Sequence, residues 1–189
     1  MMRVTPTDLP DVKLIVPKKF EDARGFFVET YSRRALAAQG IDTVFVQDNL
    51  SLSRPAGTVR GLHFQTPPFA QDKLIQVTRG SILDVAVDIR AGSPSFGRHV
   101  AVRLSAADPT QMLVPIGFAH GFCTLEPDTE VMYKVSAFYS GEHDRGIRWN
   151  DSALAIAWPV TAGRAILSDK DTRNSMLADL PPVFHYEAR

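Results

Sequence analysis

This chain of 189 residues has a single cysteine, no net charge and few long apolar runs. Cys123 is the only cysteine, which excludes an internal disulfide and any zinc site built from several cysteines. Lys and Arg together number 21, as do Asp and Glu, so the formal net charge is zero. No overall field therefore attracts nucleic acid or an anionic membrane, and we expect neither as a partner.

The first residues, Met1 to Val16, contain no long apolar core and include Asp8, Pro10 and Asp11. This composition fits neither a secretory signal nor a membrane span, so we expect a cytoplasmic location. The chain also shows no internal repeat, Gly-rich phosphate loop, linker or shift in composition. We therefore expect one domain over residues 1–189.

Thirteen prolines and twelve glycines divide the chain into short runs rich in Val, Ile, Leu and Phe. Between Gly80 and Gly92, apolar residues alternate with Asp84, Ala86 and Asp88, which is typical of a strand with one face on a core. Further strands are predicted at Val12–Val16, Phe26–Tyr31, Val44–Leu52, Val59–Phe64, Leu74–Thr78, Val100–Leu104, Met112–Pro115, Gly121–Leu125 and Glu130–Phe138. So many short strands predict a mainly β sandwich or barrel.

One short peripheral helix is predicted, beginning after Ser32 as its cap, running through Ala37 and ending near Gly40. The chain after Pro159 is expected to be less regular than the rest.

Two of the five histidines, His63 and His120, stand beside glycines in strand or turn contexts. A single histidine in a strand is more often a structural residue than a catalyst. However, the spacing Pro-x-Gly-x-x-His around His120 resembles the second motif of the cupin superfamily, and Gly61-x-His63 falls where the first motif is expected. Metal-binding cupins carry a His-x-His pair and a carboxylate there, and both are missing after His63. Because a stable site normally needs three protein ligands, no metal is expected.

Nearly the whole chain resembles the dTDP-4-dehydrorhamnose 3,5-epimerase family of deoxysugar biosynthesis. Tyr133-Lys134, continued by Tyr139-Ser140, belongs to this resemblance, and six longer blocks carry most of it in the right order: Asp22–Glu29, Gln47–Ser51, Val59–Gln65, Gly117–Phe122, Glu142–Trp149 and Leu167–Asp171. The family fold is a β jelly roll that forms a dimer. The resemblance thus implies a cupin-like jelly roll, a homodimer and no cofactor.

The resemblance also implies a catalytic group for each step of inverting a carbon next to a ketone. Such a reaction needs a base for the α proton, a stabiliser for the enolate oxygen and an acid on the opposite face. His63 matches the base, because an imidazole accepts protons near neutral pH. Asp171 matches its orienting carboxylate, with Asp169 left open as an alternative, and Lys73 and Tyr133 match the enolate stabiliser and the acid. Judged by residue type alone, Lys73 would be a surface lysine.

The substrate-binding residues are carried over in the same way. Arg24, Arg60 and Lys170 match family positions that contact the substrate, where a pyrophosphate needs positive charge. Tyr139 matches the residue that stacks on thymine, and His120 is expected to hydrogen-bond the sugar. The expected binding set is Arg24, Glu29, Gln47, Asp48, Asn49, Arg60, Lys73, His120, Tyr139, Asp144 and Lys170, with Arg24 and Glu29 reaching across the dimer interface. Two residues depart from the family pattern: Asp144 replaces a usual glutamate and Phe138 a usual tyrosine.

The leading hypothesis is epimerisation at C3 and C5 of dTDP-4-dehydro-6-deoxy-D-glucose to give dTDP-4-dehydro-L-rhamnose. The first alternative is a nucleotide-deoxysugar epimerase that acts at one carbon, C3 or C5. Two others are a non-catalytic sugar-binding cupin and a metal-dependent cupin oxygenase or isomerase. Covalent catalysis by Cys123 is rejected, because a buried and inert thiol is the commoner case.

Overall fold

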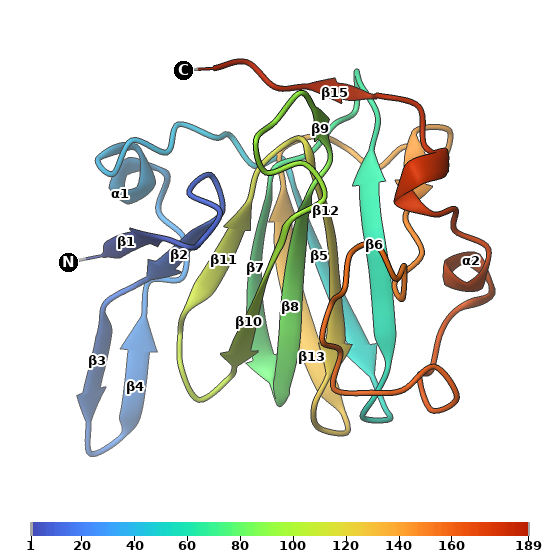
Figure 1. The fold of residues 1–189 in the computed structure, drawn as a ribbon. Coiled ribbons are helices and arrows are strands. Elements are labelled where there is room, and N and C mark those ends of the chain that lie inside the picture. Colours follow the sequence, from blue (N-terminus) through green and yellow to red (C-terminus); the bar gives the residue numbers. More distant parts are fainter. Residues whose placement is uncertain (1, 189) are drawn as a thin grey trace.

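The fold is a sandwich of two antiparallel β-sheets, seen in a computed structural model that describes residues 2–188 (Figure 1). The outermost residues of the expected domain, Met1 and Arg189, lie outside the described range, and a single domain over 1–189 remains a prediction. The first sheet has the order β1 (Arg3–Pro6), β2 (Lys13–Val16), β11 (Gln111–Val114), β7 (Lys73–Arg79), β13 (Thr129–Val135) and β5 (Gln47–Ser53). The second has the order β10 (His99–Ser105), β8 (Ser81–Asp88), β12 (Phe118–Thr124), β6 (Val59–Gln65) and β14 (Asp144–Gly146).

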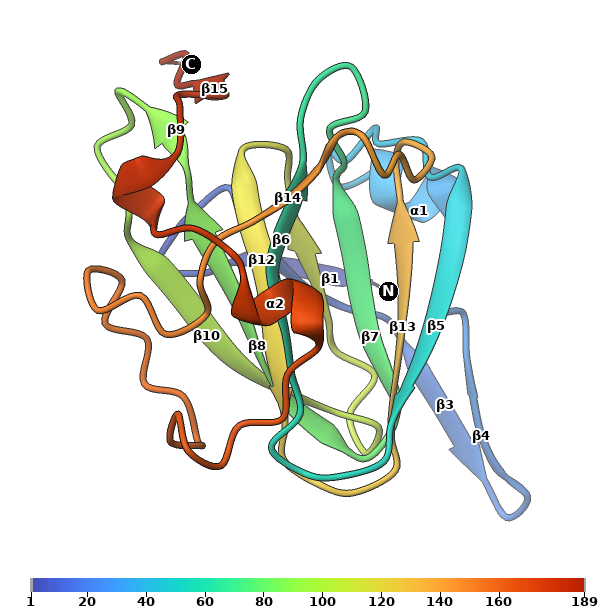
Figure 2. The same cartoon turned by 90° about the vertical axis from the view of Figure 1, so that its right-hand side faces the viewer.

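Smaller elements surround the sandwich. The hairpin of β3 (Lys19–Asp22) and β4 (Gly25–Val28) projects from the body, while β9 (Arg90–Ala91) pairs in parallel with β15 (Phe184–His185) (Figures 1 and 2). The helices are α1 (Arg33–Ala37), α2 (Asp169–Thr172) and a 3₁₀ turn at Leu177–Asp179. Among the described residues, no helix is both long and apolar enough to cross a membrane.

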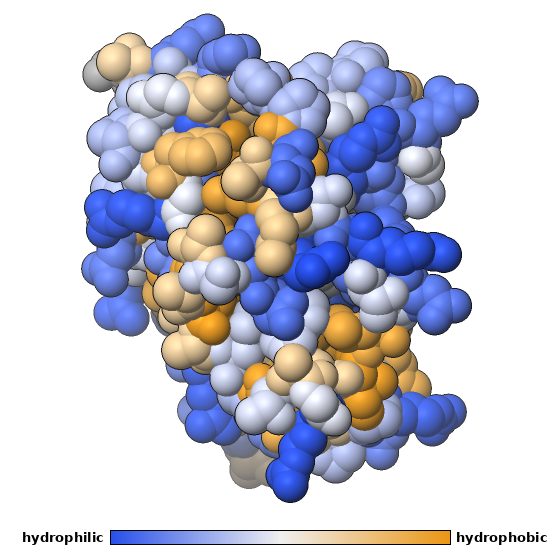
Figure 3. Space-filling model, turned by 45° about the vertical axis from the view of Figure 1, so that its right-hand side comes forward, coloured by the Kyte–Doolittle hydropathy of each residue, from blue (hydrophilic) through white to orange (hydrophobic). Residues whose placement is uncertain are grey.

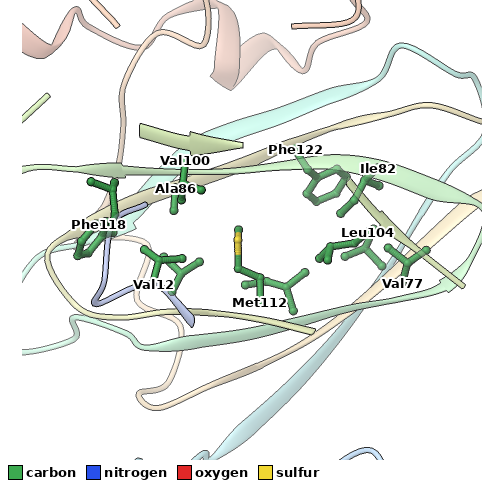
Figure 4. Close-up of a cluster of buried hydrophobic side chains, with 13 residues drawn as sticks. Val12, Val77, Ile82, Ala86, Val100, Leu104, Met112, Phe118 and Phe122 are labelled. Carbon is green, nitrogen blue, oxygen red and sulfur yellow. The ribbon is translucent and has the colours of Figure 1, made fainter. Parts of the chain in front are cut away.

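The main core fills the space between the sheets. Phe118 and Phe122 of β12 pack there with Ile82 of β8 and Met112 of β11 (Figure 4). Each such side chain contributes roughly 1.5–3 kcal/mol when removed from water. Because side chains alternate along a strand, Asp84 of β8 faces the same interior as Ile82, and so does His120 of β12, between Phe118 and Phe122. Two polar residues are thereby placed inside an apolar sandwich.

The mainly β architecture confirms the sequence prediction, and each predicted strand overlaps an observed one. The short helix is also as predicted, since Ser32 Oγ accepts a hydrogen bond from the Ala35 amide at 3.3 Å. Several strand ends were wrong. The strand predicted at Val44–Leu52 begins only at Gln47, and the one predicted at Glu130–Phe138 ends at Val135. In both places the apolar pattern extends beyond the strand itself: it starts before β5 begins and goes on after β13 ends.

Two glycines allow β6 and β12 to approach closely. Gly61 has φ +122°, and a Cβ added there would lie 2.6 Å from the Gly121 Cα and 2.7 Å from the His120 carbonyl oxygen. Only glycine fits such a contact without backbone movement. The pairing places His63 directly opposite His120. The glycine of the Gly-x-His motif noted in the sequence is therefore required for the packing of these two strands.

Candidate active site

One polar cavity opens between the two sheets and encloses about 300 Å³. Its lining draws on both sheets and on the loops that join them: Gln47, Asn49, His63, Phe64, Gln65, Gln71, Lys73, Tyr133, Tyr139 and Asp144. Phe64, Gln65 and Gln71 were not predicted. Gln65 could have been found, because it follows His63 by two residues along one strand and so shares its face. The surface on the side that carries α2 mixes hydrophilic areas with hydrophobic patches (Figure 3).

His63 and Asp171 form a close pair at one wall of this cavity. The His63 Nε2 lies 2.5 Å from the Asp171 Oδ1. Ser168 caps α2 and donates from its Oγ to the other Asp171 carboxylate oxygen at 2.9 Å. Burial alone would raise the pKa of Asp171, but the hydrogen bonds and charges of His63, Ser168 and Lys170 outweigh it and hold this pKa below its ordinary value. Asp171 thus stays ionised, and Asp171 rather than Asp169 contacts His63.

Lys73 is buried rather than on the surface, with 9% of its area exposed. It opens β7, and its Nζ donates to the His63 carbonyl oxygen at 3.3 Å. Burial lowers the pKa of Lys73 to about 8, although the carboxylates of Asp144 and Asp84 act in the opposite direction. An ammonium in this position is partly stripped of water, so it interacts strongly with any negative charge that forms in the cavity.

Tyr133 faces His63 from the opposite sheet. It lies on β13, beside Asn49 of β5 and Ile75 of β7, whereas His63 belongs to β6 of the second sheet. Burial raises the pKa of Tyr133, partly offset by the charge of Arg60. The phenol therefore keeps its proton at neutral pH and can donate it. An imidazole and a phenol thus stand on opposite walls of one cavity.

His120 lies deeper than the cavity lining. Its Nε2 is 2.7 Å from the Asp84 Oδ1, and both residues are buried. The other oxygen of Asp84 is buried, and no hydrogen-bond partner for it is found among residues 2–188. The structure therefore places His120 behind the cavity, against an aspartate that the sequence did not single out. Its expected contact with the sugar stays a prediction.

A charged cluster stands at the outer end of the cavity. The Tyr139 hydroxyl donates to the Asp144 Oδ2 at 3.1 Å, and the Lys170 ammonium pairs with the same oxygen. The short Asp144 thus reaches both partners despite replacing the usual glutamate. A flat aromatic ring beside a cation suits a nucleobase and a phosphate.

Besides His120 and Lys170, four predicted binding residues are not among the described residues that line the cavity of their own chain. Arg60 donates to the Ser53 Oγ at 3.1 Å and to the Leu52 carbonyl oxygen at 3.2 Å. Asp48 projects from the outer face of β5 and pairs with Lys134. Arg24 stands at the turn of the β3–β4 hairpin, 90% exposed and paired with Asp22, and Glu29 directly follows this hairpin. Within residues 2–188, no group of three His, Cys, Asp or Glu side chains is placed to hold a metal ion.

The fold and the cavity define a class of protein: a cupin-like β-sandwich whose cavity holds a histidine from one sheet, paired with a carboxylate of α2, and a lysine and a tyrosine from the other sheet. A family profile described as dTDP-4-dehydrorhamnose 3,5-epimerase matches residues 6–179. The chain belongs to this family.

Individual relatives agree with the profile. The dTDP-4-dehydrorhamnose 3,5-epimerase of Sinorhizobium fredii is 51% identical over 178 residues, covering 94% of this chain and 91% of the relative. The crystal structure of the Bacillus anthracis enzyme, with TDP and PPi bound, is 54% identical, with a TM-score of 0.90 over 93% of this chain and 99% of that one. The Legionella pneumophila enzyme in complex with dTDP-4-keto-L-rhamnose is 40% identical, with a TM-score of 0.93 and full coverage of both chains.

Proposed function

We propose that this protein epimerises dTDP-4-dehydro-6-deoxy-D-glucose at C3 and C5 to give dTDP-4-dehydro-L-rhamnose. The observation that carries the proposal is the placement of His63 and Tyr133 on opposite sheets across one cavity. Inversion of a carbon requires a proton to leave one face and another to arrive on the opposite face. The family of the chain, and the 3,5-epimerase names of its relatives, support this reading over a one-centre epimerase.

His63 acts as the base. Its neutral imidazole takes the proton from C3 or C5, and the electron pair of the broken C–H bond moves into the ketone to form an enolate at the C4 oxygen. Asp171, held ionised by its hydrogen bonds, fixes the ring and stabilises the imidazolium. Asp171 accepts a hydrogen bond from the His63 Nε2–H. The other ring nitrogen, Nδ1, therefore remains to receive the substrate proton.

Lys73 and Tyr133 complete each inversion. The Lys73 ammonium stabilises the negative C4 oxygen, which is shared by the enolates formed at C3 and C5. Tyr133 then donates its phenolic proton to the carbon from the opposite wall. The resulting phenolate and imidazolium return to their starting forms by proton exchange with solvent. One set of groups can therefore act on both carbons, because both flank the same ketone.

The nucleotide lies at the outer end of the cavity. Tyr139 stacks on thymine and Lys170 pairs with the pyrophosphate. In the structure both side chains contact Asp144, so substrate binding rearranges these contacts. Gln47 and Asn49 line the same cavity, and the Gln47 Nε2 donates to the Asn49 Oδ1 at 2.8 Å. We place the reaction in the cytoplasm, where a buried free thiol such as Cys123 stays reduced.

The working form is a homodimer. Leu50 and Leu52 project from β5, an edge strand, and are 66% and 40% exposed. Phe26 and Phe27 on the hairpin are 65% and 67% exposed. An edge strand and an arm with this much exposed apolar surface favour contact with another chain. In a dimer, the hairpin carries Arg24, with Glu29 just behind it, to the cavity of the partner.

A charged substitution at the edge strand is expected to separate the dimer and weaken substrate binding. Leu50→Arg should give a monomer by analytical ultracentrifugation and raise KM at least about tenfold, because each lost charged hydrogen bond costs about 1.5–3 kcal/mol. Phe96→Ser, at an apolar residue exposed elsewhere, is the matched control and should change neither. A monomeric variant that keeps full activity would refute the dimeric site.

Substitution of Tyr133, the proposed acid, is expected to impair inversion of the carbon while removal of its proton continues. Tyr133→Phe keeps the ring and removes the donated proton, so His63 can still form the enolate. We expect inversion at C5 to slow by about 10²-fold, while solvent isotope still enters the sugar. Phe138→Tyr, which restores the usual family residue at an exposed position, is the control. Unimpaired double epimerisation by Tyr133→Phe would show that another group protonates the carbon.

The direct test of the proposed function is conversion of dTDP-4-dehydro-6-deoxy-D-glucose, followed by proton NMR of the product. The coupling constants of the sugar ring report the configuration at C3 and at C5 separately. Inversion of both carbons supports the proposal, and inversion of one assigns the chain to a one-centre epimerase. No conversion despite tight dTDP binding would favour a sugar-binding protein instead.

A further inference from the structure

Three glutamine side chains hold the backbone of four consecutive residues, 137–140, at the outer end of the cavity. The Gln71 Nε2 donates to the Ala137 carbonyl oxygen at 2.7 Å, and the Gln65 Nε2 donates to the Phe138 carbonyl oxygen at 3.1 Å. In the other direction, the Tyr139 amide donates to the Gln47 Oε1 at 3.2 Å and the Ser140 amide to the Gln65 Oε1 at 2.7 Å. Every residue of segment 137–140 is thus held through its main chain.

Two other hydrogen bonds hold the segment at its far end: the Tyr139 hydroxyl donates to Asp144, and the His143 amide donates to the Ser140 carbonyl oxygen at 3.1 Å. Strand β13 ends at Val135, so residues 137–140 belong to no sheet. The rings of Phe138 and Tyr139 are each 63% exposed and contribute little packing. The glutamines, by contrast, come from well-anchored places: Gln47 begins β5, Gln65 ends β6 and Gln71 precedes β7. Their amides therefore tie the main chain of the segment to the sheets.

Gln65 is the central member of this set. It is 4% exposed, and its Nε2 also donates to the Phe69 carbonyl oxygen at 2.7 Å, so the amide ties together two loops. It also follows His63 by two residues on β6, so one strand fixes both the base and the segment that carries Tyr139. A shift of segment 137–140 would move the nucleotide relative to the base.

We propose that Gln65, assisted by Gln71, is a positioning residue that sets Tyr139 in place before the nucleotide arrives. This inference rests on the proposed function, in which Tyr139 stacks on the thymine ring. Pre-ordering the segment removes an entropic cost from binding, so the glutamines act on substrate affinity rather than on the chemical step. Gln65 acts through Tyr139, because its amide is occupied by main-chain groups.

The test is a double-mutant cycle between Gln65→Leu and Tyr139→Ala. The readouts are the Kd of dTDP by calorimetry and, separately, KM and kcat. Gln65→Leu alone should raise Kd and KM about tenfold, because it removes hydrogen bonds to both ends of Phe138–Ser140 and leaves their main-chain groups unpaired. It should change kcat by less than about twofold. In the Tyr139→Ala background the same substitution should raise Kd by less than about twofold, because the ring it positions is gone.

Equal effects of Gln65→Leu in both backgrounds would overturn the proposal, since Gln65 would then act independently of Tyr139. A fall in kcat larger than the rise in KM would overturn it as well. Gln71→Leu, which removes only the contact to Ala137, serves if the first variant does not fold, and should raise Kd about threefold. Gln39→Leu, an exposed position after α1, is the matched control. Failure of the wild-type protein to bind dTDP would count against the proposed function itself, whereas normal wild-type binding with unaffected glutamine variants would contradict only this inference.

Discussion

Substitution of His63 by alanine is expected to lower turnover by about 10⁴-fold, the upper end of the range for loss of a general acid or base. The imidazole is the basic group of the cavity that Asp171 orients from 2.5 Å, and its removal leaves that carboxylate with Ser168 as its side-chain partner. Exchange with solvent should disappear at C3 and at C5 together, because one base serves both carbons. The Kd of dTDP should change by less than about twofold, since Tyr139 and Lys170 are the residues that we assign to the nucleotide.

His185→Ala is the matched control, because His185 is exposed on β15 and is not among the described residues that line the cavity. It should leave both turnover and exchange unchanged. A His63→Ala protein that lost exchange at one carbon only would contradict the account, since a second base would then serve the other carbon.

Substitution of Lys73 by methionine is expected to lower kcat by about 10²- to 10³-fold, as for loss of a single group that stabilises an oxyanion. Methionine has a similar length and suits the buried position, so the fold should survive. The ammonium is the required form, and burial lowers the pKa of Lys73 to about 8. The kcat/KM of the wild-type enzyme should therefore fall as the pH rises through about 8, because the lysine loses its charge there.

The Lys73→Met variant should lack this alkaline decline, although its activity is low at every pH. Lys13→Met, a change of the same kind on strand β2 of the same sheet, should keep both the wild-type rate and the wild-type decline. A Lys73→Met enzyme with the full rate, or with an unaltered alkaline decline, would exclude Lys73 as the group that stabilises the enolate.

Strong local signals made the fold and part of the site predictable. Alternating apolar residues placed the central strands, and the Ser32 cap placed α1. The choice between Asp171 and Asp169 could not be made from sequence, because both lie in one short helix. Two residues along a helix point in different directions, and only the orientation of α2 on β6 decides which one reaches His63. Asp171 is 3% exposed, whereas Asp169 is exposed.

Features that depend on distant pairing were missed. Nothing near Asp84 in the sequence indicates that it will meet His120 inside the sandwich, because the contact follows from the register of β8 and β12. The hold of Gln65 and Gln71 on segment 137–140 likewise joins residues about 70 positions apart. Arg24 and Glu29 illustrate the reverse case: they were predicted for the site but lie outside the cavity of one chain, and the roles that we propose for them require a second copy.

The central claim is that one base on one sheet and one acid on the other invert two carbons beside the same ketone. It is tested most directly by incubating the protein with dTDP-4-dehydro-6-deoxy-D-glucose in deuterated water and following the C3 and C5 protons by NMR. The account predicts that deuterium enters at both carbons and that neither exchanges with the His63→Ala protein. Exchange confined to one carbon, or exchange that survives the loss of His63, would contradict it.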